Sequence, residues 1–265
     1  MKTLVLANQK GGVGKSALGT QLAYYLHAAG LRTLFVDLDH QQNSSKAILK
    51  SGRAVAPGYS SSEMLLNGKR DVPNANFVIV PGDDKLSSLE REPSTHNAIA
   101  TNLHGFLAGV SSQFDVCLVD TNPNPDIRYA SALITGNYVL SPIQLNQEAI
   151  DGIGSLLKHP RYGYFKIKEV LNPQLELIGI MPNMVENTPF QKGNFQQLAQ
   201  AFAKLLIPMD DTGKSFAFVA KRSVIAEAQA EGAYIAEIKK TAARDAWRDI
   251  KPAFEVIARR MKLEV

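Results

Sequence analysis

The sequence is almost free of cysteine, because Cys117 is the only one among 265 residues. A single thiol excludes a disulfide or a Cys-based metal cluster within one chain, and it is typical of a reducing compartment. Long apolar runs are also missing, since no stretch approaches the ~18 residues that span a bilayer. Hydrophobic residues still make up 45% of the chain and charged residues 20%, which excludes wholesale disorder. We therefore expect a globular, cytoplasmic protein with no stable membrane association.

The net charge of +4 is placed unevenly along the chain. Residues 1–213 hold 18 Lys/Arg and 18 Asp/Glu, whereas residues 214–265 hold 11 basic and 7 acidic residues. The whole excess therefore lies in the last 52 residues. It indicates either a solvated helical surface of mixed charge or a surface that meets a polyanion.

Short apolar runs alternate with amphipathic stretches, which predicts an α/β fold with a mostly parallel sheet flanked by helices on both faces. The expected strands are Thr3–Asn8, Thr33–Asp37, Phe77–Val80, Asp115–Asp120, Tyr138–Ser141 and Leu175–Met181. Helices are expected near 15–29, 97–111, 127–135, 146–158 and 190–205, and Ser51–Ser62 and Gly82–Asn97 are expected to be loops. No repeat or linker is evident, so residues 1–265 are interpreted as one domain with a helical, basic part at about 222–265.

The most specific motif follows the first expected strand and opens the first expected helix. It reads Asn-Gln-Lys-Gly-Gly-Val-Gly-Lys-Ser over residues 8–16. Glycines let backbone N–H groups approach an anion, and the positive end of the next helix favours a phosphate there. Lys15 would reach the β- and γ-phosphates of a nucleotide, and the Ser16 hydroxyl would bind Mg²⁺. The candidate nucleotide contacts are Lys10, Gly11, Gly12, Val13, Gly14, Lys15, Ser16 and Ala17.

A second lysine, Lys10, precedes the glycine pair, and Gln9 stands where the usual phosphate-binding loop has its first glycine. Lys10 is too close to the start of the loop to reach its own phosphates easily while Lys15 occupies them. It can instead reach a nucleotide held by a second copy of the chain. The alternative is an ordinary surface lysine on a turn.

The segment Lys-Gly-Gly-Val-Gly-Lys-Ser resembles the deviant Walker A motif of the ParA/MinD ATPases, and further segments resemble the plasmid-partition branch with its IncC-type members. The resemblance implies a P-loop ATPase that uses ATP and Mg²⁺, with slow intrinsic turnover. It also implies a homodimer that encloses two ATP molecules, in which Lys10 crosses to the other subunit. Lys10 and Lys15 would then be catalytic.

Two acidic segments follow strand candidates. Asp37 and Asp39 lie on the same side of the second strand, at the edge where open α/β sheets bind ligands. A carboxylate there can order the attacking water or hold hydrated Mg²⁺, or it can simply cap a helix. The segment resembles the family motif D-x-D-P-Q-G-N, which implies a hydrolytic role for Asp39, although His40 and Gln42 replace the proline and glycine.

Asp120 ends an apolar strand in the manner of a Walker B motif, so we expect it to bind Mg²⁺ directly or through water, together with Ser16 and Asp39. The family usually continues D-[TC]-[PA]-P, and Asn122 departs from that pattern. Two further residues, Asn183 and Pro208, match segments that lie near the adenine in the family. Both are common in plain turns as well.

The basic tail resembles the partition ATPases in its segment Lys221–Ala228, which implies non-specific DNA binding by Arg222. Downstream basic residues recur at spacings of 4, 4 and 3, so one continuous helix, ended or kinked by Pro252, would align them. The candidate DNA contacts are Lys221, Arg222, Lys240, Arg244 and Arg248, with Lys251 on the same stripe. The alternative is a solvated helix face balanced by Asp245 and Asp249.

Together the motifs favour an ATP-dependent DNA-partitioning ATPase that is associated with the nucleoid. A closed dimer would bind DNA, and a ParB-type centromere-binding partner would stimulate hydrolysis and release. No DNA-reading motif precedes the nucleotide loop, as in the short partition ATPases. The alternatives are a MinD-like ATPase that cycles on membranes and an ATP-gated scaffold or filament with little turnover. The amphipathic segment 254–262 either binds a membrane or, as we favour, packs on the core.

Overall fold

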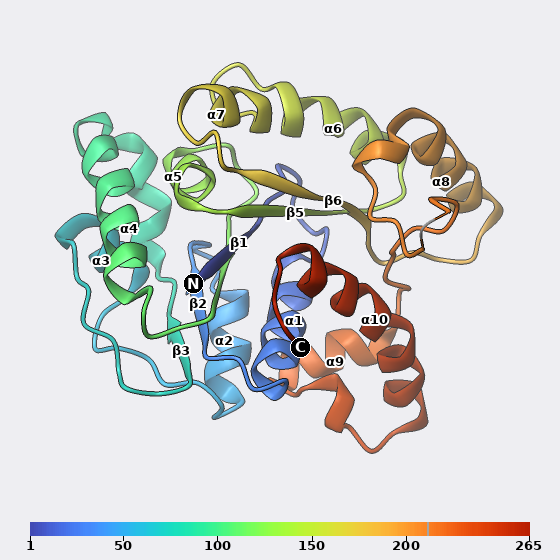
Figure 1. Ribbon diagram of the computed structural model, residues 1–265, viewed down its shortest axis with the longest axis horizontal. Coiled ribbons are helices and arrows are strands. Elements are labelled where there is room, and N and C mark those ends of the chain that lie inside the picture. The colour runs from blue at the N-terminus through green and yellow to red at the C-terminus, as the bar shows by residue number, and fades with distance from the viewer. Residues whose placement is uncertain (211) are drawn as a thin grey trace.

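The computed structural model describes residues 1–210 and 212–265, with residue 151 described by its backbone alone. Its centre is a parallel sheet with the strand order β3-β2-β4-β1-β5-β6 (Figure 1). The strands are β1 (Lys2–Leu6), β2 (Thr33–Asp37), β3 (Phe77–Val80), β4 (Val116–Asp120), β5 (Tyr138–Ile143) and β6 (Glu176–Pro182). The predicted mostly parallel sheet is confirmed, and each predicted strand lies within two residues of an observed one.

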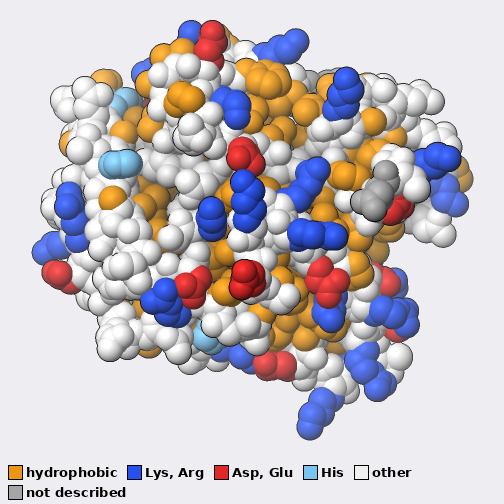
Figure 2. All heavy atoms as spheres, in the orientation of Figure 1, with side chains coloured by type: hydrophobic (Ala, Val, Ile, Leu, Met, Phe, Trp, Pro, Cys, Tyr) orange, Lys and Arg blue, Asp and Glu red, His pale blue; other side chains and the backbone are white. Residues whose placement is uncertain are grey.

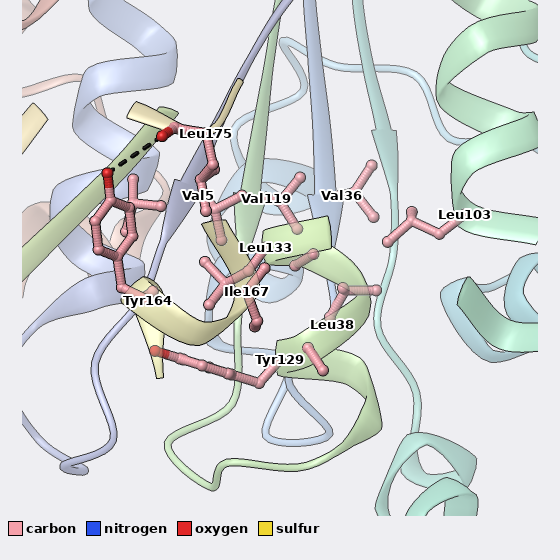
Figure 3. Packing of buried hydrophobic residues seen from close by; sticks show 14 of the residues in the cluster. Val5, Val36, Leu38, Leu103, Val119, Tyr129, Leu133, Tyr164, Ile167 and Leu175 are labelled. Carbon is pink, nitrogen blue, oxygen red and sulfur yellow. Dashed lines mark hydrogen bonds between the residues drawn. The ribbon is translucent and has the colours of Figure 1, made fainter. Parts of the chain in front are cut away.

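Helices cover both faces of the sheet because alternate strand residues are apolar on both sides. Val5 and Val119 contribute to the cluster under α4 (His96–Val110), α5 (Ile127–Thr135) and α7 (Tyr164–Val170), which Figure 3 shows from close by. In the same view the Tyr164 hydroxyl donates to the backbone oxygen of Leu175 at 3.2 Å. This face also packs against α3 (Ser61–Asn67), α6 (Gln147–Lys158) and α8 (Pro189–Phe202).

The opposite face carries α1 (Lys15–Ala28), α2 (Asn43–Lys50), α9 (Ser223–Glu231) and α10 (Thr241–Arg260), which lie together in Figure 1. The C-terminal helix buries Phe254 and Ile257 completely, and Met261 directly after it is also completely buried. Packing on the core is therefore confirmed for this helix, since its apolar stripe is already covered. In the described part of the chain, no helix is both long and apolar enough to cross a membrane.

Several local predictions were wrong or incomplete. The segment Gly82–Asn97 is not a plain loop, because it forms 3₁₀ helices at Asp84–Arg91 and Pro93–Thr95 that bury Leu86 and Leu89, and α4 already begins at His96. The other expected loop, Ser51–Ser62, runs into the start of α3, which begins with a capping box between Ser60 and Glu63. The short helices α2, α3 and α7 were not predicted, since each has eight residues or fewer.

Pro252, which was predicted to end or kink the C-terminal helix, does not end it. A proline inside a helix removes one backbone hydrogen bond. The residues that follow it, Ala253 and Phe254, are buried, and their packing keeps the chain helical past the proline. Further 3₁₀ turns lie at Ala203–Leu205 and Ile235–Glu237.

Candidate nucleotide-binding site

The glycine-rich loop connects β1 to α1 at the carboxyl edge of the sheet. Gly12 and Gly14 have φ values of 74° and 81°, a region in which a side chain would be strained. A Cβ on Gly14 would also lie 2.4 Å from the Asn183 side-chain nitrogen. Gly14 is the N-cap of α1 and has no side-chain cap. The first N–H groups of α1 therefore remain available to an anion.

Lys15 is 6% exposed and points into the loop. Its Nζ donates to the backbone oxygens of Asn8 at 3.3 Å and Lys10 at 3.5 Å. Burial lowers the pKa of Lys15, and the nearby carboxylates of Asp120 and Asp39 oppose that shift. A buried ammonium held by two carbonyl groups is well placed to meet phosphate oxygens.

Lys10 points away from this loop. Its Nζ forms an ion pair with Glu148 at 2.7 Å and donates to Asn146 Oδ1 at 3.3 Å, both at the start of α6. The ion pair lowers the pKa of Glu148. Because both partners are solvent-accessible, the pair contributes little to stability and can exchange for another anion.

Two buried carboxylates stand at the ends of neighbouring strands. Burial raises the pKa of Asp37 to about 7, and the nearby Asp120 adds to the rise. Burial likewise raises the pKa of Asp120 to about 6, against the hydrogen bond from Ser44 and the attraction of Lys15. Each carboxylate accepts a hydrogen bond from a different serine in the first turn of α2. Ser44 Oγ donates to Asp120 at 2.7 Å, and Ser45 Oγ donates to Asp37 at 2.6 Å.

Asp39 follows β2 in a turn that leads into α2. Its Oδ1 accepts from the Gln41 backbone N–H at 3.0 Å and lies 3.4 Å from His40 Nδ1. Gln42 has a φ of 59°, so it takes the left-handed conformation that glycine adopts freely. The replacement of glycine by Gln42 therefore keeps the turn, and its side chain is held by Asp84 Oδ1 at 2.8 Å.

The residues expected to hold Mg²⁺ fit that ion. Asp120 Oδ1 is buried without a hydrogen-bond partner, which leaves an acceptor for a metal-bound water. Ser16 lies close enough to influence the pKa of Asp120. Among the side chains that the structure describes, no group of three His, Cys, Asp or Glu forms a metal cage. Mg²⁺ here would therefore take most of its ligands from water and phosphate, as it commonly does.

A cavity of about 740 Å³ opens over the loop. It brings together Gly11–Ala17, which includes Lys15 and Ser16, with Asp39 and Pro123. It also includes residues that the sequence analysis missed, namely Lys46 and Lys50 of α2 and Gln229 and Ala230 of α9. The first two were detectable as lysines one helical turn apart just after the acidic motif. The α9 residues carry no local signal.

An apolar cavity of about 280 Å³ adjoins the other side of the loop. It shares Gly14, Ala17 and Met184 with the larger cavity and has the apolar lining that is typical of a small-molecule site. Asn183 lines it and donates from Nδ2 to the backbone oxygen of Val13 at 2.8 Å. Pro208 is not among the described residues that line this cavity, and it forms an isolated bridge with Phe216.

The candidate DNA contacts lie on α10 and in the segments just before α9 and α10. Most are paired with carboxylates: Lys221 with Glu186, Arg222 with Asp249, Lys240 with Glu227, and Arg248 with Asp245. Arg244 instead donates to the Thr241 hydroxyl at 3.2 Å. Figure 2 shows Lys and Arg side chains interspersed with acidic ones where α9 and α10 lie in Figure 1. Arg222 also lines the apolar cavity.

A buried strand, a left-handed glycine loop, a lysine and serine at the helix start and acids on two adjacent strands together define a P-loop nucleotide-binding protein. The family model described as "AAA domain" matches residues 1–177. Protein IncC of Escherichia coli is 30% identical over 273 residues, which cover 99% of this chain and 70% of the relative. Chromosome-partitioning ATPase Soj of Treponema pallidum is 33% identical over 192 residues, 70% of this chain and 72% of the relative.

Solved structures agree at the level of the fold. Apo McdA of Cyanothece has a TM-score of 0.76 at 19% identity and covers 98% of both chains. A plasmid partition protein of Borrelia burgdorferi, bound to AMPPNP, has a TM-score of 0.71 at 17% identity and also covers 98% of both chains. The chain therefore belongs to the ParA/MinD family of P-loop ATPases, in its plasmid-partition branch.

Proposed function

We propose that this protein is a DNA-partitioning ATPase, in which Mg-ATP closes two copies face to face and the closed dimer binds DNA non-specifically. The observation that carries the proposal is the opposite orientation of two lysines from one loop. Lys15 is buried beside the phosphate position, whereas Lys10 reaches outward to Glu148. The Lys10 ammonium can exchange Glu148 for the phosphates of a nucleotide that is bound in the facing subunit.

Within one subunit, each part of the nucleotide has a counterpart. The apolar cavity would take the adenine, with Asn183 Oδ1 as an acceptor for its amino group. The triphosphate would cross Gly14 into the larger cavity and meet Lys15. A solved structure of McdA carries ATP on the same fold. Pro208 has no place in this binding mode.

Hydrolysis would depend on Asp39. Its Oδ1 is committed to the Gln41 N–H, and its Oδ2 is left to orient the attacking water. Lys15, with Lys10 of the facing copy, would neutralise charge that develops on the phosphoryl oxygens. Ser16 and Asp120 would hold Mg²⁺, which supplies charge stabilisation at the phosphates. The hydrogen-bonded Oδ1 and the short turn keep Asp39 in place for this role.

DNA binding would follow closure, because two copies bring two basic surfaces together. We infer that Lys221 and Arg222, which precede α9, and the basic residues at the start of and within α10 contact phosphates and that the protein is nucleoid-associated. A ParB-type centromere-binding partner would stimulate hydrolysis and open the dimer. Residues 1–265 would act as one ATPase domain, since α9 and α10 share the core with α1. The MinD-like alternative is not favoured, because the C-terminal apolar residues are buried.

One experiment distinguishes ATP-gated DNA binding from the membrane-binding alternative. DNA binding is measured with ATP, ADP and a non-hydrolysable analogue, with molecular mass recorded in parallel. The proposal expects DNA binding and a doubled mass with ATP and the analogue, and neither with ADP. Equal DNA binding in all three nucleotide states would contradict ATP-gated binding. Binding to anionic liposomes in place of DNA would support the membrane alternative.

A further inference from the structure

Ser44 occupies an unusual position at the start of α2. It is completely buried, yet its hydroxyl faces a carboxylate that lies 76 residues away in the sequence. The hydroxyl donates to Asp120 Oδ2 at 2.7 Å, while the other oxygen, Oδ1, has no partner. One oxygen of this carboxylate is thus fixed by the protein, and the second is left open.

The next residue, Ser45, serves a different acid. Its backbone N–H and its hydroxyl donate to Asp37 Oδ2 at 2.9 and 2.6 Å, and its hydroxyl accepts from the Gly82 N–H at 2.9 Å. Asp37 is therefore satisfied on Oδ2 by Ser45 and on Oδ1 by the Asp39 N–H. Two adjacent serines of similar burial give one acid a complete set of donors and leave the other acid incomplete.

The position of Ser44 does not depend on its contact with Asp120, because α2 is anchored elsewhere. The Tyr24 hydroxyl donates to the backbone oxygens of Ala47 at 3.3 Å and Gly232 at 3.1 Å, which ties α2 to the end of α9. The Gln229 side chain donates to the Asn43 backbone oxygen at 2.9 Å. The helix therefore presents the Ser44 hydroxyl to Asp120 as a fixed donor.

We infer that Ser44 is a positioning residue for the divalent cation: it orients the Asp120 carboxylate so that Oδ1 faces the metal-bound water. The inference rests on the proposed function, which places Mg²⁺ at Ser16 and Asp120. The terminal torsion of an aspartate has a broad, shallow energy profile, so a lone carboxylate does not hold one orientation. A donor on one oxygen selects the orientation and leaves the other oxygen to the hydrated ion.

The test compares Ser44→Ala with Ser45→Ala in the full chain, using a fluorescent ATP analogue. Nucleotide affinity is measured in EDTA and then across a Mg²⁺ titration. For Ser44→Ala we expect unchanged nucleotide affinity in EDTA. The Mg²⁺ concentration that gives half of the metal-dependent increase in nucleotide affinity should rise about tenfold. For Ser45→Ala we expect a lower melting temperature with a Mg²⁺ requirement close to that of the wild type.

Ser44→Cys is the second variant, because it fills the same site with a weaker donor if Ser44→Ala does not fold. A wild-type Mg²⁺ requirement in either folded Ser44 variant overturns the inference. An equal loss of affinity in EDTA and in Mg²⁺ also overturns it, since that pattern reports a structural role. If the wild type binds no nucleotide in either condition, the proposed function itself fails, and the inference fails with it.

Discussion

Asp37 and Asp120 stand opposite each other as register partners at the ends of β2 and β4, and both are completely buried. Burial raises the pKa of Asp37 to about 7 and that of Asp120 to about 6, and repulsion adds to each rise, from Asp120 on Asp37 and from Asp39 on Asp120. The nucleotide-free site therefore binds protons at a higher pH than ordinary carboxyl groups do. A bound cation or the Lys15 ammonium favours the ionised forms.

The buried pair predicts a specific pH dependence of stability. Both pKa values lie above the ordinary value of 3.8, so the folded chain binds protons that the unfolded chain releases between about pH 4 and pH 7. The free energy of unfolding should fall as pH rises through that window, by at most about 1.4 kcal/mol per pH unit for each linked proton. Urea unfolding of nucleotide-free wild type and Asp37→Asn measures the effect.

Asp37→Asn should show a shallower fall with pH than the wild type, whatever its absolute stability. The exposed Glu264→Gln is the matched control and should follow the wild-type curve. Parallel curves for Asp37→Asn and wild type would show that Asp37 is ionised in the folded state throughout this range.

Replacement of Lys15 by alanine should remove most of the ATP affinity. The buried ammonium would be absent where the phosphates bind, and each charge-assisted hydrogen bond is worth about 1.5–3 kcal/mol. Lys46→Ala is the control, since Lys46 lines the same cavity from an exposed position. Equilibrium titration should show affinity at least about tenfold weaker for Lys15→Ala and little change for Lys46→Ala. Equal effects of the two changes would place the phosphates elsewhere.

Asp39→Ala should separate binding from turnover. ATP affinity should stay close to wild type, because the carboxylate contacts water in the proposed site rather than a phosphate, whereas steady-state phosphate release should fall by at least about 100-fold. His40→Ala serves as a control, since His40 touches the oxygen of Asp39 that is already committed. Normal release by Asp39→Ala would remove this residue from the reaction.

Arg244→Glu should weaken ATP-dependent DNA binding without a change in ATP affinity, because Arg244 lines neither nucleotide cavity and has no carboxylate partner among the described residues. The salt dependence of binding should fall by about 0.9 in slope for each DNA phosphate that the variant no longer neutralises. The exposed Lys69 supplies the control Lys69→Glu. Arg222→Glu should act in the same direction, with ATP affinity checked separately. An unchanged slope would place the DNA surface elsewhere.

The sheet and the nucleotide loop were predictable because their signals are local. Buried parallel strands such as Thr33–Asp37 are apolar on both faces, and the loop before Ser16 requires glycine at fixed positions. The role of Ser44 was not predictable, because its partner is set by the register of β2 against β4. The only local signal was a pair of serines directly after the acidic motif.

The contacts of the basic C-terminal residues were predictable only in part from the sequence. Its helical spacing was correct for Arg244, Arg248 and Lys251, but Lys240 is the N-cap residue rather than part of the helix. The carboxylates that neutralise Lys221 and Arg222 come from distant segments, Glu186 and Asp249, so pattern alone could not show them.

The central claim is that Mg-ATP joins two copies with Lys10 directed at the facing nucleotide. Small-angle scattering or light scattering of Asp39→Ala under saturating Mg-ATP tests it most directly, with Asp39→Ala/Lys10→Ala as the matched control. We predict twice the monomer mass for Asp39→Ala and the monomer mass once Lys10 is also replaced. A monomer for both wild type and Asp39→Ala would contradict the account.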